Sequence, residues 1–467
     1  MTDSHTDLLI VGAGPAGMAA AVAARSYGLS VRLVDDQPAP GGQIWRGIET
    51  VAATPRLALL GAAYAEGSTR AAAFRACGAT YEAECQVWQI EQGFRVYLSQ
   101  RNQARAVTAD AVILAVGAQE RPVPFPGWTL PGVLTVGAAQ ILLKTANSVP
   151  ADPVWIAGCG PLPLLYMTQL LAAGGRIAGF LDTTPRGRLR GALRHLPRGL
   201  SRFGDLAKGL GWSLALRRGG FPIIRHVTEL HAEGEGRLGR LHYRTEQGRS
   251  GTVEARVLLV HEGVVPSIHP PLALSCEMSW HPGQKCLVPR LDGWGESSQQ
   301  NVFVVGDAAG IGGAEAAEPR GKLAALRVAA RLGKLDQGRA EEAAAVERTS
   351  LARALALRPF LDALYEPRSQ VFSPPDETIV CRCEEVTAGD LRTLAMQGRP
   401  GPNQVKAFSR AGMGPCQGRQ CGSTVAHLLA ASQGRSIEEV GFFRVRPPLK
   451  PVTLGELASL DEKEPAE

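Results

Sequence analysis

The chain begins with a short apolar run, Leu8 to Val11, that is followed by a glycine-rich turn and a segment with helical periodicity. A continuous apolar run of this length is typical of a strand that is buried on both faces of a sheet. A second apolar run ends at Asp35, so this unit is predicted to form strand, turn, helix and strand. The pattern returns in residues 153–182 and again, as strand, turn and long helix, in residues 301–333. It therefore predicts an α/β protein with two Rossmann-like dinucleotide-binding units.

The turn after the first apolar run has the spacing G-x-G-x-x-G at Gly12, Gly14 and Gly17. Gly12 permits a sharp turn, Gly14 lets a pyrophosphate approach the backbone, and Gly17 lets the helix pack closely on the strand. The helix that begins at Pro15 and Ala16 offers free N–H groups and a partial positive charge to the phosphates. Because strand, turn and helix are all in place, we predict a dinucleotide site here.

A carboxylate stands where the ribose of that dinucleotide is expected. Asp35 lies about twenty residues after the glycines and is favoured over Asp36 as the acceptor of ribose hydrogen bonds. Three further segments resemble the FAD domain of the glutathione-reductase-like superfamily and favour FAD over NAD. Their residues are Gly41, Gly42 and Gln43, then Ala115 and Gly117, and finally Gly306, Asp307 and Gly313. Asp307 is expected at the ribityl hydroxyls, and the helix start that follows is expected at the flavin pyrimidine edge.

The second unit keeps the topology of an NAD domain but not its full glycine pattern. Gly158 and Gly160 are present, whereas Pro163 replaces the third glycine and gives up the close packing that glycine allows. The unit ends at Asp182, and a basic, helix-prone stretch, residues 186–225, follows at once and could occlude the crevice. We therefore expect a retained scaffold with an altered or empty pocket, with productive NAD binding as the alternative.

Four of the nine cysteines form two clips: Cys381 and Cys383 in C-x-C, and Cys416 and Cys421 in C-x4-C. The segment "TIVCRCEEV" is typical of a strand end that turns both thiols toward one centre, and the glycine-rich segment before the second clip can donate N–H groups to cluster sulfides. Four cysteinates suit Zn²⁺ or an iron–sulfur cluster, with free thiols as a third alternative. Zinc clips usually separate their cysteines by two to four residues, so the C-x-C clip favours [2Fe-2S].

The other five cysteines make no redox pair of the kind that disulfide reductases have beside the flavin. We expect them to be buried thiols: Cys77, Cys85, Cys159, Cys276 and Cys286. No catalytic acid or base and no clamp for a substrate carboxylate can be assigned in this chain.

Length, composition and charge exclude several classes of protein. The 467 residues, 45% hydrophobic and 20% charged, predict two or three globular domains. With neither an apolar run of transmembrane length nor a basic leader, we expect a cytoplasmic protein without stable membrane insertion. Between Thr183 and Thr228, ten Arg or Lys residues stand against one acid, Asp205. Aromatic residues are not interleaved there, so we expect a solvated or protein-docking face rather than a nucleic-acid site.

Motifs along nearly the whole chain resemble the α subunits of one group of flavoproteins. The segments are "VDDQPAPGGQIWRG", "VGAQERPVPFPGWTLPGVLTVGAAQ", "HEGVVPSIHP", "GDAAGIGGAEAAEPRGKLAAL", "IVCRCEEVTAGDLR" and "RAGMGPCQGRQCG". The group comprises opine (octopine/nopaline) oxidases, D-hydroxyproline dehydrogenase and hydrogen cyanide synthase. Heterotetrameric sarcosine oxidase and dye-linked L-proline dehydrogenase are more distant relatives. The cysteine segment is similar to the ferredoxin-like [2Fe-2S] domain of bacterioferritin-associated ferredoxin, whose second clip is shorter.

The resemblance implies a division into three parts and a tail. These are a discontinuous FAD domain (1–122 and 284–365), an NAD-like domain (123–283) with the basic insertion 186–225, an α-rich [2Fe-2S] domain (376–450), and a tail (451–467). In that group, a D-amino-acid-oxidase-like flavoprotein β subunit binds FAD and oxidises the amine, an FMN can lie at the α–β interface, and a small third subunit can be present. Some relatives hold ATP where FAD is expected, but Gly306 and Asp307 favour flavin.

We therefore predict the electron-transfer α subunit of a heteromeric, flavin-dependent amine or imino-acid dehydrogenase. It would pass electrons from a β-subunit flavin via FMN and [2Fe-2S] toward FAD and an acceptor. One alternative is a self-sufficient NAD(P)H-dependent flavin and iron–sulfur reductase. The other is a non-catalytic, nucleotide-binding zinc scaffold subunit.

Overall fold

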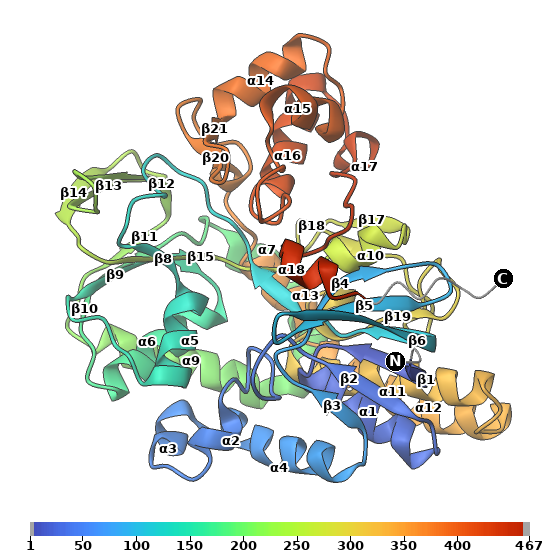
Figure 1. The fold of residues 1–467 in the computed structure, drawn as a ribbon. Coiled ribbons are helices and arrows are strands. Elements are labelled where there is room, and N and C mark those ends of the chain that lie inside the picture. Colours follow the sequence, from blue (N-terminus) through green and yellow to red (C-terminus); the bar gives the residue numbers. More distant parts are fainter. Residues whose placement is uncertain (1–3, 461–467) are drawn as a thin grey trace.

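The computed structural model describes residues 4–460. Two sheets with flanking helices lie side by side, and a small helical domain formed by the C-terminal part of the chain lies above them (Figure 1). Of the predicted tail, residues 461–467 lie outside the described part, as do residues 1–3 of the first domain.

The first sheet has seven strands. Six follow the order β3-β2-β1-β6-β5-β4, and β19 pairs with the C-terminal end of β6. The pairs that involve β1, β2, β3, β6 and β19 are parallel, whereas β4, β5 and β6 pair antiparallel. The strands are β1 (Ser4–Val11), β2 (Val31–Val34), β3 (Thr80–Glu82), β4 (Gln86–Ile90), β5 (Arg95–Gln100), β6 (Gln103–Leu114) and β19 (Val302–Val304). The continuous apolar runs predicted as strands are thus the buried central strands of this sheet.

Helices cover one face of the first sheet. Leu8 and Ile10 of β1 point into a core with helices α1 and α11, whereas Leu9 points to the opposite face and packs near Cys276. This alternation follows from the period of two along a strand. The helices of this unit are α1 (Pro15–Ser26), α2 (Ile48–Val51), α3 (Arg56–Leu60), α4 (Ala62–Ala76), α11 (Ala314–Arg331) and α12 (Gln337–Leu355).

The second sheet is entirely parallel, in the order β11-β10-β9-β15-β8. Its strands are β8 (Val133–Thr135), β9 (Val154–Cys159), β10 (Ile177–Asp182), β11 (Ile223–Arg225) and β15 (Leu258–Glu262), and helices α5 (Val136–Ala146) and α6 (Pro161–Ala172) pack on it. An antiparallel sheet of β12 (Val227–Glu233), β13 (Arg240–Thr245) and β14 (Ser250–Glu254) completes this unit. The two units are connected by β7 (Ala118–Glu120), which pairs antiparallel with β16 (Val264–Pro266).

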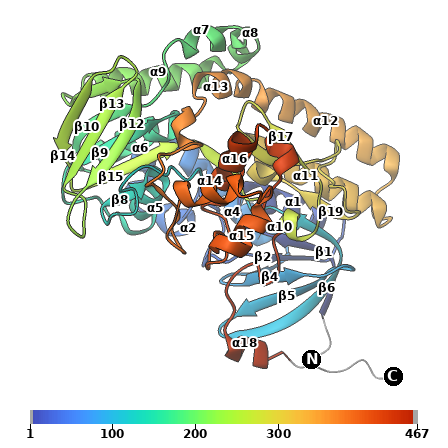
Figure 2. The same ribbon diagram turned by 90° about the horizontal axis from the view of Figure 1, so that it is seen from above.

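The predicted basic insertion is helical and packs against a later helix of the same chain. It forms α7 (Arg188–Leu193), α8 (Leu196–Gly199), a short 3-10 turn (Leu200–Arg202) and α9 (Phe203–Arg217). Ala192 and Leu196 pack on Leu357 and Phe360 of the segment that contains α13 (Arg358–Leu364). Figure 2 shows these helices along one edge of the molecule, far from α18 (Leu454–Ala458), which lies beside β6.

The C-terminal domain is built from short helices around its own core. Its elements are β20 (Ile379–Cys381), β21 (Val386–Thr387), α14 (Ala388–Met396), α15 (Pro402–Ser409), α16 (Gly422–Gln433) and α17 (Ile437–Val440). Val405, Val425 and Phe443 are among its fully buried residues. Below it lie α10 (His269–Ala273) and the antiparallel pair of β17 (Met278–His281) and β18 (Cys286–Pro289). Among the described helices, none is long and apolar enough to cross a membrane.

The contact between α1 and α11 depends on Gly321. A Cβ atom at this position would lie 2.1 Å from the backbone oxygen of Ala16, and backbone cannot give way as a flexible side chain can. We predict that Gly321→Ala lowers the free energy of unfolding by about 1–3 kcal/mol, measured by urea denaturation, because overpacking outweighs the helix propensity of alanine. Gly211→Ala in α9, where nothing lies within 4 Å, is the matched control and should be neutral or stabilising. Equal stability of Gly321→Ala and the unchanged chain would contradict this account.

Candidate functional site

The glycine turn after β1 is held by close backbone contacts. Gly12 has a φ of +107°, and a Cβ there would lie 2.4 Å from the backbone oxygen of Ala115. A Cβ at Gly17 would lie 1.9 Å from the backbone oxygen of Gly12, so both positions require glycine for packing. Gly14 differs, because its nearest neighbour would be the Cα atom of Gly42 at 3.9 Å. The space beside Gly14 is therefore open for a ligand.

Helix α1 points its N-terminus at this space. Gly14 is the N-cap, Pro15 is the first helical residue, and no acidic side chain lies in the first turn. Ala16 and Gly17 follow, both buried, so the end of the helix presents backbone rather than side chains. A helix N-terminus of this kind attracts phosphate through its unpaired N–H groups and its dipole.

Asp35, the predicted ribose acceptor, lies immediately after β2 and anchors the turn. Its two carboxylate oxygens accept hydrogen bonds from the backbone N–H groups of Ala13 and Gln37. Burial raises the pKa of Asp35 despite these bonds. A carboxylate can accept about four hydrogen bonds, so two remain for a ribose. Asp36 is more exposed and forms an ion pair with Lys450 from the C-terminal segment.

The second glycine pair closes over the first turn. The N–H group of Gly41 donates to the carbonyl of Ala13 over 2.8 Å, and a Cβ at Gly42 would lie 2.9 Å from the Cα atom of Gly14. Gln43 follows with an exposed side chain, and its carbonyl accepts a hydrogen bond from the Nζ atom of Lys144 over 3.0 Å. The predicted segment 41–43 thus lies against the predicted phosphate-binding turn.

Lys144 is a residue of this region that the sequence did not indicate. It belongs to α5 of the second unit, is buried, and donates to the carbonyls of Gln43 and Ile44. Burial lowers its pKa to about 8. A lysine at the end of an amphipathic helix has no distinguishing pattern in one sequence, and only the packing of the two units reveals this contact.

The remaining predicted flavin residues lie at the ends of β6 and β19. Ala115 follows β6 and donates its N–H group to the carbonyl of Val11, and Gly117 has a φ of +65°. Gly306 follows β19 closely, and a Cβ there would touch the Cβ atom of Ala16 at 3.0 Å. Because β1, β6 and β19 are parallel neighbours, their carboxyl ends meet at one edge of the sheet.

Asp307 orders the loop before α11. Its Oδ1 atom accepts hydrogen bonds from the N–H groups of Gly312 and Gly313, over 2.9 and 2.8 Å. Arg320, a second residue that sequence reasoning missed, donates to the carbonyls of Gly306 and Gly310 from the first turns of α11. The segments that contain the predicted cofactor residues therefore converge, and their glycines leave room where side chains would otherwise fill the space.

The crevice of the second unit is narrowed by its own side chains. A Cβ at Gly158 would lie 2.1 Å from the backbone oxygen of His261, and the ring of His261 lies about 4.0 Å from the Cβ position of Gly160. The Nδ1 atom of His261 pairs with Glu120, which also accepts the N–H group of Gly137 at the start of α5. An imidazole thus stands beside the turn that would receive a pyrophosphate.

The segment after α13 packs at the carboxyl ends of the strands that form the same crevice. The guanidinium of Arg368 binds the carboxylate of Glu262 over 2.9 Å, and both side chains are buried, 5% and 1% exposed. The thiol of Cys159 lies 3.8 Å from the carbonyl of Tyr365 and 3.6 Å from Glu262. These contacts lie at the carboxyl ends of β9 and β15, where a dinucleotide binds in an open α/β sheet.

The four clip cysteines come together in the C-terminal domain as two pairs. Cys381, at the end of β20, lies beside Cys421 at the start of α16, and Cys383 lies beside Cys416. The pairs do not merge into one compact group. In residues 4–460, a set of three or more ligand atoms within 4.8 Å of one another occurs only at His5, Asp7 and Asp110.

Glycines bring the backbone close to these sulfur atoms. A Cβ at Gly414 would lie 2.2 Å from the Cβ atom of Cys383, and Gly412 and Gly418, both with positive φ, pack on the ring of Phe443. The sulfur of Cys381 accepts N–H groups from the backbone, including that of Gly412.

These contacts polarise the two buried thiols of the clips. The hydrogen bond from Cys421 and the backbone N–H groups lower the pKa of Cys381 to about 6. That same bond, together with burial, raises the pKa of Cys421 well above its ordinary value. The pKa of one sulfur of the pair is thus shifted toward the thiolate, which is the form that binds metals.

The other cysteines lie apart from this group. Cys85, Cys159, Cys276 and Cys286 are buried as expected, whereas Cys77 is only partly buried. Burial raises the pKa of Cys286 to about 11 and that of Cys85 to about 12. Such thiols are inert, because the thiolate is the reactive form.

Comparison with known proteins identifies the family. A model of the pyridine nucleotide-disulphide oxidoreductases matches residues 6–164, and a model of the sarcosine oxidase A3 domain matches residues 376–460. The opine oxidase subunit designated "A" in Rhizobium meliloti (strain 1021) is 42% identical over 459 residues, covering 98% of this chain and 99% of that protein. This chain belongs to the family of that opine oxidase subunit. Hydrogen cyanide synthase subunit HcnB of Pseudomonas aeruginosa is 33% identical, covering 97% of this chain and 98% of HcnB.

Solved structures agree on the fold. L-proline dehydrogenase from P. horikoshii superimposes with a TM-score of 0.71 at 19% identity, covering 97% of this chain and 80% of that one. Thioredoxin reductase of T. acidophilum gives a TM-score of 0.51 at 16% identity over 71% of this chain and 99% of that one. The predicted α/β, Rossmann-type flavoprotein fold and the resemblance to this family are therefore confirmed. Membership in this opine oxidase family makes the chain an oxidoreductase, and its first unit implies FAD as ligand.

The open space beside Gly14 gives a direct test of the first site. We predict that Gly14→Val lowers bound FAD by tenfold or more, because a branched side chain stands where the pyrophosphate must approach. The fold should persist, since a Cβ at Gly14 meets only the Cα atom of Gly42. Released flavin per chain, with a thermal unfolding curve, measures both effects. Gly204→Val in α9, also in open space, is the control and should keep its FAD; full FAD in Gly14→Val would mean that this turn does not bind the pyrophosphate.

Proposed function

We propose that this chain is the electron-transfer subunit of a heteromeric, flavin-dependent dehydrogenase of opines, D-hydroxyproline or related imino acids. As a member of its family it is an oxidoreductase that acts on CH–NH bonds and one component of a multi-subunit, flavin-dependent amino acid dehydrogenase. FAD and a [2Fe-2S] cluster would supply two-electron and one-electron chemistry on one chain, between the flavin of a partner subunit and an acceptor.

The observation that carries the proposal is the pairing of the four thiols. Each cysteine of the first clip lies beside one cysteine of the second clip: Cys381 beside Cys421, and Cys383 beside Cys416. Two pairs suit two irons with two thiolates each, whereas one zinc ion needs all four sulfurs around a single point. The N–H groups directed at Cys381 support the same reading, because hydrogen bonds to sulfur tune iron–sulfur clusters. We therefore assign one cysteine of each clip to each iron of a ferredoxin-like [2Fe-2S] domain.

The first cofactor site is proposed to hold FAD through backbone groups and two carboxylates. Gly12, Gly14, Pro15, Ala16 and Gly17 would receive the pyrophosphate, Asp35 the ribose, and Asp307 the ribityl chain. The turns at 41–43, 115–117 and 306–313 would enclose the cofactor. An additional FMN would lie at the interface with the partner, outside this chain's own core. The proposed domain limits are those inferred from the sequence.

The closed second crevice argues against a self-sufficient NAD(P)H-dependent reductase. A dinucleotide there would have to displace Arg368 from Glu262. Breaking a buried pair costs about 3–5 kcal/mol, or two to four powers of ten in affinity. We expect NADH to leave the flavin of the isolated chain oxidised. Rapid bleaching of the flavin by NADH would favour the reductase instead.

A test of the cluster uses the half-buried Cys416. The purified chain should contain about two irons and two acid-labile sulfides. Cys416→Ser should lose both and keep its FAD, because the thiols lie in the C-terminal domain and the flavin site lies in the first unit. Cys77→Ser, which alters a partly buried thiol outside the clips, is the control and should keep the full iron content. Zinc without labile sulfide in the unchanged chain would support the scaffold alternative.

A test of the partnership uses co-expression. The isolated chain should contain flavin but oxidise neither opines nor imino acids. Co-expression with a D-amino-acid-oxidase-like flavoprotein, together with a small third subunit where one is encoded nearby, should give a complex with dye-linked oxidation of such a substrate. A large obligate interface, on the order of 2,000 Å² or more, should make the two chains co-purify. Turnover by the isolated chain at the rate of the complex would refute the proposal.

A further inference from the structure

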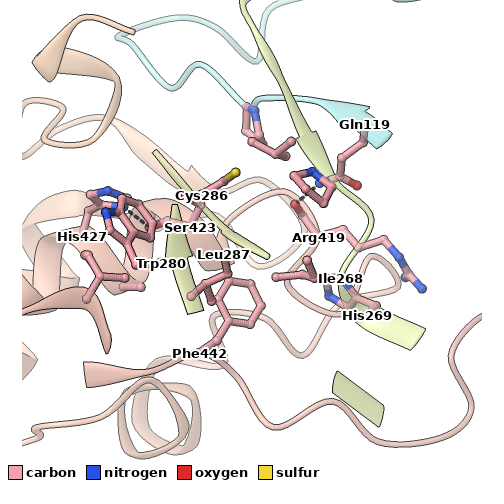
Figure 3. A pocket seen from close by; sticks show the side chains of 15 residues that line it. Gln119, Ile268, His269, Trp280, Cys286, Leu287, Arg419, Ser423, His427 and Phe442 are labelled. Carbon is pink, nitrogen blue, oxygen red and sulfur yellow. Dashed lines mark hydrogen bonds between the residues drawn. The ribbon is translucent and has the colours of Figure 1, made fainter. Parts of the chain in front are cut away.

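The apolar side chains at the base of the C-terminal domain are already covered by the chain itself. Figure 3 shows Trp280, His427 and Phe442 gathered where α16 meets β17 and β18. The rings of Trp280 and His427 lie 5.3 Å apart, and the space left among the side chains of this junction is only about 40 Å³. The junction is therefore filled, and the uncovered apolar surface of the molecule lies elsewhere.

The helical insertion α7–α9 exposes the largest group of apolar side chains in the described part of the chain. Six of the sixteen large hydrophobic residues that are exposed in residues 4–460 lie there, and no other stretch of that length has more than three. The six residues are Leu189, Leu193, Leu200, Phe203, Leu210 and Leu214. Soluble proteins seldom leave such a group in water, and its presence indicates an interaction surface.

Helix α9 has buried sides and one exposed apolar side. Leu206 packs with the residues around α13, and Leu216 packs in the core of the second unit. Phe203, Leu210 and Leu214 are spaced by seven and four residues, so they form one stripe along the exposed side. The insertion therefore does not need this stripe for its own packing.

Cations surround the apolar stripe. Between residues 183 and 228, ten Arg or Lys residues stand against one acid, Asp205, which already pairs with Arg202 and Lys208. A second copy of this chain, docked through the same surface about a two-fold axis, would bring like charges together, which is unfavourable. The surface therefore fits a different molecule, one whose facing surface is acidic around an apolar centre.

An open groove continues this surface at the end of α9. It lies beside β11, has a volume of about 880 Å³, and is lined by Arg217, Arg225 and Arg249 and by no acidic residue. Within residues 4–460, none of these three guanidinium groups forms a hydrogen bond or an ion pair. Such arginines bind carboxylates well. A protruding acidic loop can enter a recess of this kind, whereas the flat surface of a membrane cannot, so the groove favours a protein as the partner.

The same surface borders the proposed flavin site. Arg202, directly before α9, pairs with Glu315 in the first turn of α11. That turn follows Gly313, and the start of α11 is the place expected for the pyrimidine edge of the flavin. A protein docked on α7–α9 would therefore lie close to the flavin of this chain.

We propose that α7–α9 and the groove beside β11 form the docking surface for the flavoprotein partner, which contributes an acidic face with an apolar centre; the inference rests on the function proposed above. The apolar stripe of α9 fills the centre of this interface, where most of the binding energy of protein complexes arises. The arginines of the groove bind carboxylates of the partner and set its orientation.

The experiment measures how much of the co-expressed D-amino-acid-oxidase-like flavoprotein a tagged, full-length chain retains during affinity purification. One double variant, Phe203→Ser with Leu210→Ser, removes the centre of the apolar stripe. Another, Arg217→Glu with Arg249→Glu, reverses two charges of the groove. Each should retain about a tenth or less of the flavoprotein that the unchanged chain retains at about 0.15 M salt. The flavin content and thermal unfolding of each double variant should not change, because all four side chains are exposed.

Matched controls make the same changes at exposed positions outside the proposed surface. Val346→Ser with Met396→Ser alters side chains that are 64% and 76% exposed, compared with 69% and 61% for Phe203 and Leu210. Arg101→Glu with Arg353→Glu makes the same change in net charge. Both controls should retain the flavoprotein as the unchanged chain does.

Three results would overturn the inference. If the unchanged chain retains the flavoprotein and both double variants retain as much as their controls, this docking surface is wrong and the heteromeric function stands. If the unchanged chain retains none, the heteromeric function fails and the docking surface fails with it. If the double variants retain the flavoprotein but no longer sediment with vesicles of phosphatidylglycerol that the unchanged chain binds, the surface belongs to an anionic membrane instead.

Discussion

The structure depends on backbone-to-backbone contact at the carboxyl edge of the first sheet. Gly12 lies against Ala115, Gly17 against Gly12, and Gly42 against Gly14. Each contact is closer than a Cβ atom would permit, so side chains are excluded from the region where β1 and β6 end. The same absence of side chains allows a pyrophosphate to reach the helix N-terminus. In the FAD site proposed above, packing and ligand binding would both require glycine at these positions, whereas Gly14, whose surroundings are open, would be required by the ligand alone.

The fold could be predicted from the sequence because its signals are local. The apolar runs at 8–11 and 154–159 are buried strands, and each is followed by glycines at the turn that leads into a helix. Asp35 and Asp307 were also visible, since Asp35 directly follows a strand and Asp307 lies three residues after the end of one. In the structure, both carboxylates also bind backbone groups. Asp35 accepts a hydrogen bond from the N–H group of Ala13, and Asp307 accepts hydrogen bonds from those of Gly312 and Gly313. Their carboxylates preorganise the loops that would bind the cofactor.

The contacts between distant segments could not be predicted. Lys144 binds carbonyls a hundred residues away at Gln43 and Ile44, and Arg368 binds Glu262 across a similar distance. Nothing in the local pattern marks these residues, because an arginine in a proline-rich linker has the same appearance whether it is solvated or buried. The pairing of cysteines across the two clips is of the same kind. Spacing indicated four ligands, but which thiol stands beside which depends on how α16 packs against β20.

The second unit has the topology of a dinucleotide fold, and segments of the same chain pack at its crevice. Its parallel sheet still supports the antiparallel sheet β12–β14 and the insertion α7–α9, and its crevice receives the segment that leads from α13 to the C-terminal domain. Arg368 lies at this crevice and pairs with Glu262, a buried carboxylate that would otherwise have no cationic side chain bonded to it, which is costly. That segment thereby fixes the start of the cysteine domain relative to the flavin unit. In the electron-transfer subunit proposed above, the separation of the two cofactors would matter, and this buried ion pair would help to hold the two domains at a constant distance.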